Sequence, residues 1–375
     1  MKRILTRILL ILPLLVLLLL GVAAATQSAE SGWTGDTDDD SVRVAPEPTA
    51  ALMEFHNALA REEYAEARAV VDRLKSMDDL TIRPWMRMLR ASLTVTVAID
   101  FGVEEKENLF HSDVKIATKA FEWTLKQEQD DASDERLASL YAALGTLMLL
   151  NAQWENEIDG DLLKSATMAS DGYTRMKKAY RLDESRMDAL LGTAAYRFFR
   201  SHTLKFITWM PFIKDDREDA LEDMRRVIQT PGPAQPGAVT TLAWSLIEMG
   251  RPDEAVTACE PWLMVLDNPR HLLEPYAKAQ FVAENWADAK AAYDLYITKI
   301  KAAPVLNTER LLGALSRALQ SSKPLNDWEA IAAYADEALS QPLSEDEWRE
   351  FDDFRDGFEE YKAKAAERLG GGTGE

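Results

Sequence analysis

From residue 50 onward, apolar side chains recur at the three- and four-residue spacing of amphipathic helices. Polar turns interrupt this pattern at intervals of about fifteen residues, which is the length of an ordinary helix with its connection. Few runs alternate β-branched and polar residues, so no segment is convincing as a strand. The chain is therefore predicted to be all-α, built from short helices that pair into hairpins.

The same residues recur at the start of several predicted helices, at nearly constant intervals along the sequence. An acidic residue precedes Ala220, Ala255 and Ala289, and the intervals between these alanines are 35 and 34 residues. A larger side chain follows four residues later in each unit, as in Ala220 and Met224, Ala255 and Cys259, Ala289 and Tyr293, and Ala330 and Tyr334. Small residues let paired helices approach closely, and large ones fill the holes between neighbouring pairs. The sequence thus predicts a stacked array of similar units.

This period and these places resemble the tetratricopeptide repeat, whose pattern is W-x2-L-G-x2-Y, then A-x3-F, then P. Tyr141, Leu144 and Gly145 match the first helix of that pattern, and so do Leu191 and Gly192. The resemblance is best over residues 135–300 and is to exported bacterial tetratricopeptide-like proteins of unassigned activity. It implies a right-handed solenoid of helical hairpins and brings no established activity with it.

The predicted organisation has six parts. They are a signal peptide or signal anchor at 1–25, a flexible acidic spacer at 26–49, degenerate helical hairpins at 50–134, tetratricopeptide-like repeats at 135–343 with an aromatic insertion at 198–214, a capping helix at 344–369, and a flexible tail at 370–375. Ser344 and Glu347 have the spacing of a capping box at the start of the capping helix. Trp348 and Phe358 fall on one side of it, opposite acidic residues.

The N-terminal segment has the layout of a secretory signal. Lys2, Arg3 and Arg7 precede an apolar run that ends in small residues at 23–25. Residues 8–25 are also at the lower length limit for crossing a bilayer, so an uncleaved anchor is the alternative. Both interpretations predict export to the periplasm or cell envelope, with membrane contact only through this segment if it is uncleaved.

Charge and composition narrow the function classes. The chain of 375 residues has 43 Lys and Arg against 63 Asp and Glu, a formal charge of −20, which argues against nucleic acid as a partner. The single cysteine, Cys259, excludes an intrachain disulfide. It occupies a large-residue place of a repeat and is predicted to be a buried small hydrophobe.

The sequence offers no recognisable catalytic chemistry. Nucleotide-binding glycine loops and hydrolase or metalloprotease motifs do not occur. The four histidines are scattered singly and are predicted to lie on the surface or in helix packing, so no metal and no cofactor are predicted. Ser112 and Lys115 fit S-x-x-K, but its partner motifs do not occur, and Ser112 is interpreted as a helix N-cap. We therefore expect a protein that is not an enzyme.

Two surfaces are candidates for partner binding. The insertion at 198–214 is aromatic and basic, and Trp209 and Phe212 in it are either a docking element or aromatic core. By the resemblance, first helices line a groove, where the facing residues would be Trp244, Ile247, Glu248, Glu274, Lys278 and Phe281. Solvated surface is the alternative for this second set.

The sequence therefore favours a non-catalytic, exported scaffold or adaptor that binds a protein or peptide partner in the cell envelope. The alternative is a small-ligand-binding accessory protein of an envelope transport system, in which the helical array encloses a cavity.

Overall fold

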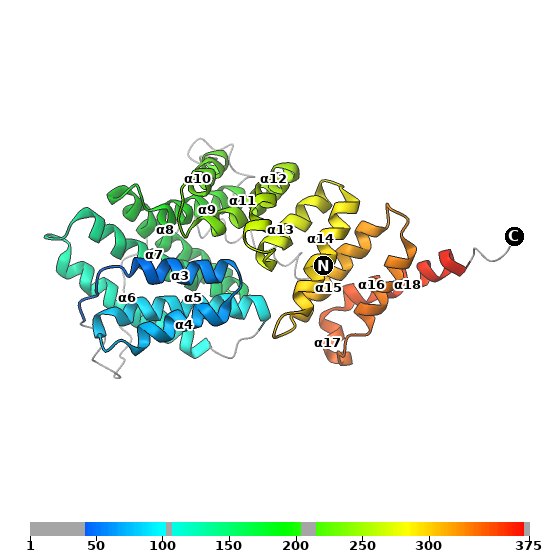
Figure 1. Cartoon of the computed structure of the whole chain (residues 1–375), viewed down its shortest axis with the longest axis horizontal. Helices are drawn as coiled ribbons and strands as arrows, with labels where there is room; N and C mark the ends of the chain where they lie inside the picture. The colour runs from blue at the N-terminus through cyan, green and yellow to red at the C-terminus, as the bar shows by residue number, and fades with distance from the viewer. Residues whose placement is uncertain (1–41, 103–106, 204–214, 371–375) are drawn as a thin grey trace. The chain divides into compact units, whose positions relative to one another are not determined.

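A computed structural model describes residues 42–102, 107–203 and 215–370. This part of the chain consists of α-helices, one short 3-10 turn and connecting loops, without a strand (Figure 1). The all-α prediction is confirmed, and the packing of consecutive helices is compatible with a helical-hairpin solenoid. None of the described helices has the length and apolar character needed to cross a membrane. The predicted signal segment and the first part of the spacer lie outside the described residues.

The chain divides into two compact units, each assembled from segments that are separate in sequence. Unit 1 comprises Met1–Phe55, Ala65–Ile99 and Glu104–Asp223, and unit 2 comprises His56–Tyr64, Asp100–Val103 and Met224–Glu375. Unit 2 therefore includes the turn between the first two described helices and the four residues at 100–103.

The helices that lie wholly or mostly in unit 1 are α3 (Thr49–Ala60), α4 (Tyr64–Ser76), α5 (Arg83–Phe101), α6 (Glu107–Glu128), α7 (Asp134–Glu157), α8 (Leu162–Leu182), α9 (Met187–Thr203) and α10 (Arg217–Gln229). The long helix α7 packs against α6, α8 and α9. Large aromatic side chains fill the interior, where the rings of Trp85 and Phe121 meet edge to face at 4.8 Å.

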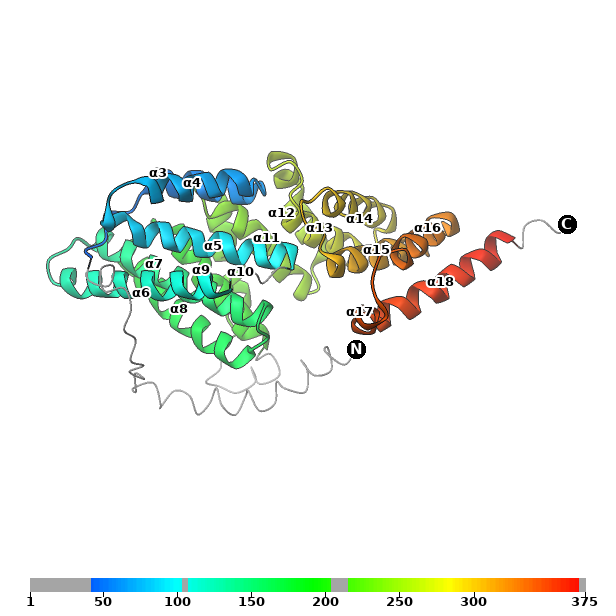
Figure 2. The same cartoon turned by 90° about the horizontal axis from the view of Figure 1, so that it is seen from below.

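The crossing of α7 and α8 depends on two glycines. A Cβ atom added to Gly145 would lie 2.8 Å from Cγ of Met176 and 3.2 Å from the carbonyl oxygen of Gly172. A Cβ on Gly172 would lie 3.0 Å from the side chain of Leu149. The two helices run alongside one another at this contact (Figure 2). The expectation that a small residue at the Gly145 place allows close helix approach is confirmed.

The prediction that Ser112 caps a helix is wrong. Helix α6 begins at Glu107, so Ser112 lies in its second turn. Phe110 has no exposed surface and packs on the ring of Trp154, with centroids 4.4 Å apart. This burial keeps the residues before Ser112 helical and moves the helix start upstream.

Unit 2 contains α11 (Gln235–Glu248), α12 (Pro252–Val265), α13 (Arg270–Val282), α14 (Trp286–Lys301), α15 (Thr308–Ser322), α16 (Trp328–Leu339), α17 (Glu345–Glu350) and α18 (Asp352–Gly370). From α11 to α16 each helix packs on the next, and α11 also packs on α13 (Figure 1). The repeat alanines Ala255 and Ala289 are completely buried, and so is Cys259. In these two repeats, the positions that the sequence pattern assigns to small and large side chains therefore belong to the core.

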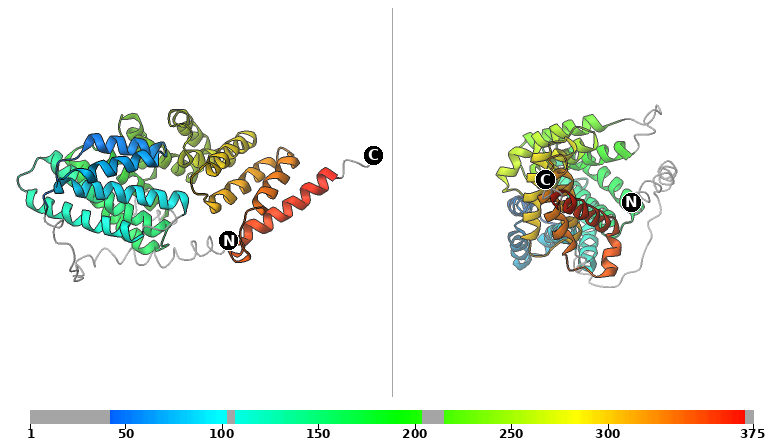
Figure 3. Two further views of the ribbon diagram at one scale, coloured as in Figure 1. Left: turned by 60° about the horizontal axis from the view of Figure 1, so that its bottom comes forward. Right: turned by 90° about the vertical axis from the view of Figure 1, so that its right-hand side faces the viewer.

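The C-terminal cap differs from the single predicted helix. The capping box is confirmed: Ser344 N–H donates to Glu347 Oε2 at 2.7 Å, and Glu347 N–H donates to Ser344 Oγ at 3.3 Å. Phe351, however, has φ −116° and ψ 25°, which ends α17 before α18 begins. A one-residue break leaves the aromatic spacing intact, so the pattern did not reveal it. Helix α18 packs on α16 (Figure 3). Its Phe358 is buried.

Candidate functional site

Helix α13 presents three of the predicted partner-binding residues on one side. Glu274, Lys278 and Phe281 are separated by four and three residues, which aligns them along the helix. All three are partly exposed. Helix α11 is the first helix of the preceding predicted repeat. On it, Trp244 is partly exposed, whereas Ile247 is only 8% exposed and contributes to packing. Four of these five side chains therefore retain some exposure to solvent, and Ile247 is buried.

Two cations lie close to the ring of Phe281. Lys278 Nζ lies 5.7 Å from the ring centroid, and the guanidinium carbon of Arg317 in α15 lies 5.0 Å from it. Trp286 meets the same ring edge to face at 5.5 Å. We call Lys278, Phe281, Trp286 and Arg317 the Phe281 cluster. The sequence did not single out Arg317 or Trp286, because only the packing of α13 against its neighbours brings them to this ring.

The charges of the Phe281 cluster are not balanced by carboxylates at contact distance. Within the described chain, neither Lys278 nor Arg317 forms an ion pair, and Arg317 donates instead to the amide oxygen of Gln320 at 3.2 Å. Burial lowers the pKa of the Lys278 ammonium, Arg317 lowers it further, and Glu248 opposes both effects. The arrangement favours an anion that would approach both cations.

Glu274 has a different environment from the rest of this face. Its carboxylate accepts a hydrogen bond from the hydroxyl of Tyr296 at 3.0 Å, and Nη1 of Arg310 lies 3.8 Å away. These contacts engage the carboxylate within unit 2. Trp209 and Phe212, the candidates in the insertion, lie outside the described residues.

A buried ionic network lies at the first turn of α13. Arg270 donates from Nε to Glu62 at 2.8 Å and from Nη2 to Asp100 at 2.6 Å. The backbone N–H of His271 donates to the second oxygen of Glu62 at 3.1 Å. Arg310 adds a hydrogen bond to Asp100 at 3.3 Å. All these residues belong to unit 2.

The charged groups of this network are bonded to one another. Tyr64 donates its hydroxyl to Asp100 at 2.7 Å, and the Arg270 side chain is only 8% exposed. Burial alone would raise the pKa of Glu62, but hydrogen bonds from His271 and Arg270 outweigh it and lower this pKa from 4.5 to about 2. These groups pair with one another, so removing one of them would leave a buried charge without compensation.

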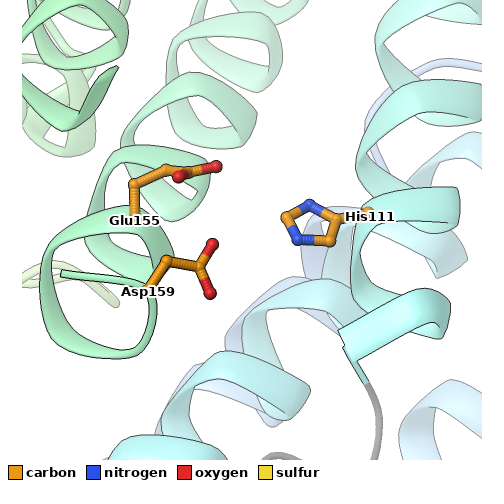
Figure 4. A group of neighbouring side chains, drawn as sticks. All are labelled: His111, Glu155 and Asp159. Carbon is orange, nitrogen blue, oxygen red and sulfur yellow. The ribbon is translucent and has the colours of Figure 1, made fainter. Parts of the chain in front are cut away.

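Unit 1 contains a group of possible metal ligands. His111 in α6, Glu155 in the last turn of α7 and Asp159 just after it place one ligand atom each within 4.8 Å of one another. Figure 4 shows the imidazole and both carboxylates directed toward a common point. Asp159 follows the C-cap residue Ile158, and Gly160, with φ +71°, then turns the chain away from the helix. The expectation that each histidine stands alone missed this group.

Part of this group has a sequence signal. A Glu and an Asp four residues apart at a helix end indicate two carboxylates on one side. His111 is far from them in sequence, and only the packing of α6 on α7 brings it close.

A comparison with models of known protein families and with curated proteins found no match for this chain.

Proposed function

We propose that this chain is a non-catalytic, tetratricopeptide-like scaffold or adaptor that binds an acidic segment of a partner protein at the Phe281 cluster. The observation that carries this proposal is a pair of cations without carboxylate partners, Lys278 and Arg317, close to the same aromatic ring. The chain as a whole carries a charge of −20, so a local excess of positive charge is unusual in it.

Elementary electrostatics supports an anionic partner. Lys278 is partly buried next to another cation, and both conditions destabilise its charged form. A carboxylate from a partner would relieve the repulsion between Lys278 and Arg317 and form charge-assisted hydrogen bonds with both. Phe281 and Trp286 supply the apolar surface that typically anchors a protein interface. An acidic segment with an apolar neighbour fits this surface best.

The wider proposal places this binding in an array of tetratricopeptide-like hairpins that is exported to the cell envelope. The 34- to 35-residue spacing of the buried alanines and the sequential packing of α11 to α16 support the array. The basic start and apolar run at residues 1–25 support export.

Crosslinking at the proposed surface tests this function. Val282 is 40% exposed and adjacent to Phe281, so a photo-crosslinking amino acid placed there samples the surface directly. Envelope proteins captured by the chain would be identified by mass spectrometry, and the crosslinked segment would be mapped. We expect capture through an acidic segment, with sensitivity to salt because exposed charges are screened.

A charge-matched pair of variants provides the control. The double substitution Lys278→Gln and Arg317→Gln is expected to abolish capture. Lys299→Gln combined with Lys301→Gln removes the same charge from the last turn of α14 and is expected to preserve it. Equal capture by both double variants would refute the assigned surface. Capture of no protein would contradict the adaptor function and favour the alternative, a protein that binds a small ligand.

A further inference from the structure

We propose that His111, Glu155 and Asp159 bind one zinc ion. The ligand atoms come from α6 and from the end of α7, lie within 4.8 Å of one another, and converge in Figure 4. The site is in unit 1 and does not depend on the Phe281 cluster.

The donor set selects the class of metal. One imidazole nitrogen and two carboxylate oxygens suit zinc and related transition ions, whereas calcium and magnesium prefer oxygen ligands alone. Three protein ligands leave the fourth tetrahedral position of zinc to water or to a donor from another molecule. The acidic character of the chain also favours the approach of a cation.

Glu155 supplies an independent indication. Its side chain is only 2% exposed, and its Oε1 contacts the Nζ of Lys164. Its charge is paired with a single ammonium, that of Lys164, which is half exposed. A carboxylate buried this deeply is ordinarily stabilised by several hydrogen bonds or by a metal. Zinc would complete its environment and displace the Lys164 ammonium into solvent.

The surrounding structure restrains the side chains of His111 and Glu155 and leaves that of Asp159 free to change rotamer. The ring of Trp154 meets His111 edge to face at 5.8 Å, and Phe110 meets it at 5.2 Å, so the imidazole has an aromatic support. Asp159 is exposed. Ligand atoms around tetrahedral zinc lie about 3.4 Å apart for metal–ligand bonds of about 2.1 Å, so a rotamer change at Asp159 suffices to close the group.

Calorimetric titration of the full chain with ZnCl₂, with excess Mg²⁺ present to mask nonspecific acidic sites, tests the proposal. We expect one saturable site, and we expect Co²⁺ in place of zinc to give the visible absorption of a tetrahedral complex. His111→Ala and Asp159→Asn should each weaken zinc binding by at least about tenfold, that is, by about 1.4 kcal/mol or more. Asp159 is exposed, so its variant leaves the fold intact even if the His111 variant does not.

Two further variants separate this site from general affinity for metal. His56→Ala removes a histidine that is outside the group and should bind zinc as wild type does. Lys164→Gln removes the competing ammonium and should bind zinc at least as tightly as wild type. Absence of a saturable site, or equal zinc affinity in wild type, His111→Ala and Asp159→Asn, would overturn the proposal. Weaker binding by Lys164→Gln would overturn the assigned arrangement of ligands.

Discussion

Replacing Arg270 with methionine tests whether the buried network holds unit 2 together. The substitution keeps an unbranched apolar side chain but removes the guanidinium that bonds Glu62 at 2.8 Å and Asp100 at 2.6 Å. It also removes the contact between the guanidinium and the ring of Phe101, which it overlies at 5.2 Å. Two carboxylates would then remain, at 11% and 9% side-chain exposure, without their shared partner.

The burial of these two carboxylates determines how much unfolding free energy the Arg270→Met variant is expected to lose. Removing one member of a buried ion pair costs about 3–5 kcal/mol, because the remaining charge is left without compensation. Arg310 still bonds Asp100 and the His271 N–H still bonds Glu62, so we expect the lower end of that range, about 3 kcal/mol. For a urea dependence of about 2 kcal/mol/M, the midpoint of unfolding falls by about 1.5 M.

Urea unfolding of the full chain, followed by circular dichroism and by tryptophan fluorescence, measures this effect. Arg349→Met is the matched control, because Arg349 pairs with Asp346 at 2.7 Å while both side chains are largely exposed, at 79% and 86%. An exposed pair of this kind contributes about 0–1 kcal/mol. A loss below about 1 kcal/mol for Arg270→Met, or an equal loss for both variants, would refute the assigned role of the network.

Three further predictions concern single residues. Gly145→Ala should destabilise the chain by about 1–3 kcal/mol through the 2.8 Å approach to Met176, and unchanged thermal unfolding would contradict the close helix crossing. Because the pKa of Glu62 falls from 4.5 to about 2 on folding, the folded state binds fewer protons, and about 3 kcal/mol of stability is lost as pH falls through that interval. Glu62→Gln should therefore show a shallower loss of stability there in urea unfolding, whereas parallel pH profiles would argue against it. Burial raises the pKa of the Cys259 thiol to about 12, so it should resist alkylation at pH 8 until urea unfolds the chain, and prompt reaction in the native state would show that the thiol is accessible.

The fold was largely predictable because its signals are local. Helical spacing and the alanine period identified core positions such as Ala255 and Ala289, both fully buried. The capping box at Ser344 was predictable for the same reason, since its two partners are three residues apart. The break at Phe351 was not, because it leaves the spacing of the aromatic residues unchanged.

The candidate sites were less predictable because they depend on packing between distant segments. The helical register placed Lys278 and Phe281 on one side of α13, but it could not show that Arg317 of α15 reaches the same ring. His111 looked isolated in the sequence because its neighbours Glu155 and Asp159 are contributed by another helix. Side chains brought together from separate helices have no fixed spacing to recognise.

The contact between Glu62 and the start of α13 also bears on the order in which the chain is made. Glu62 accepts the His271 N–H and so caps a helix that begins more than two hundred residues later. During synthesis from the N-terminus, Glu62 and Asp100 emerge before Arg270, so the buried guanidinium has both counter-ions waiting when it leaves the ribosome. A chain permuted to begin at residue 224 would reverse that order and leave Arg270 without Glu62 and Asp100 until its last segments were translated.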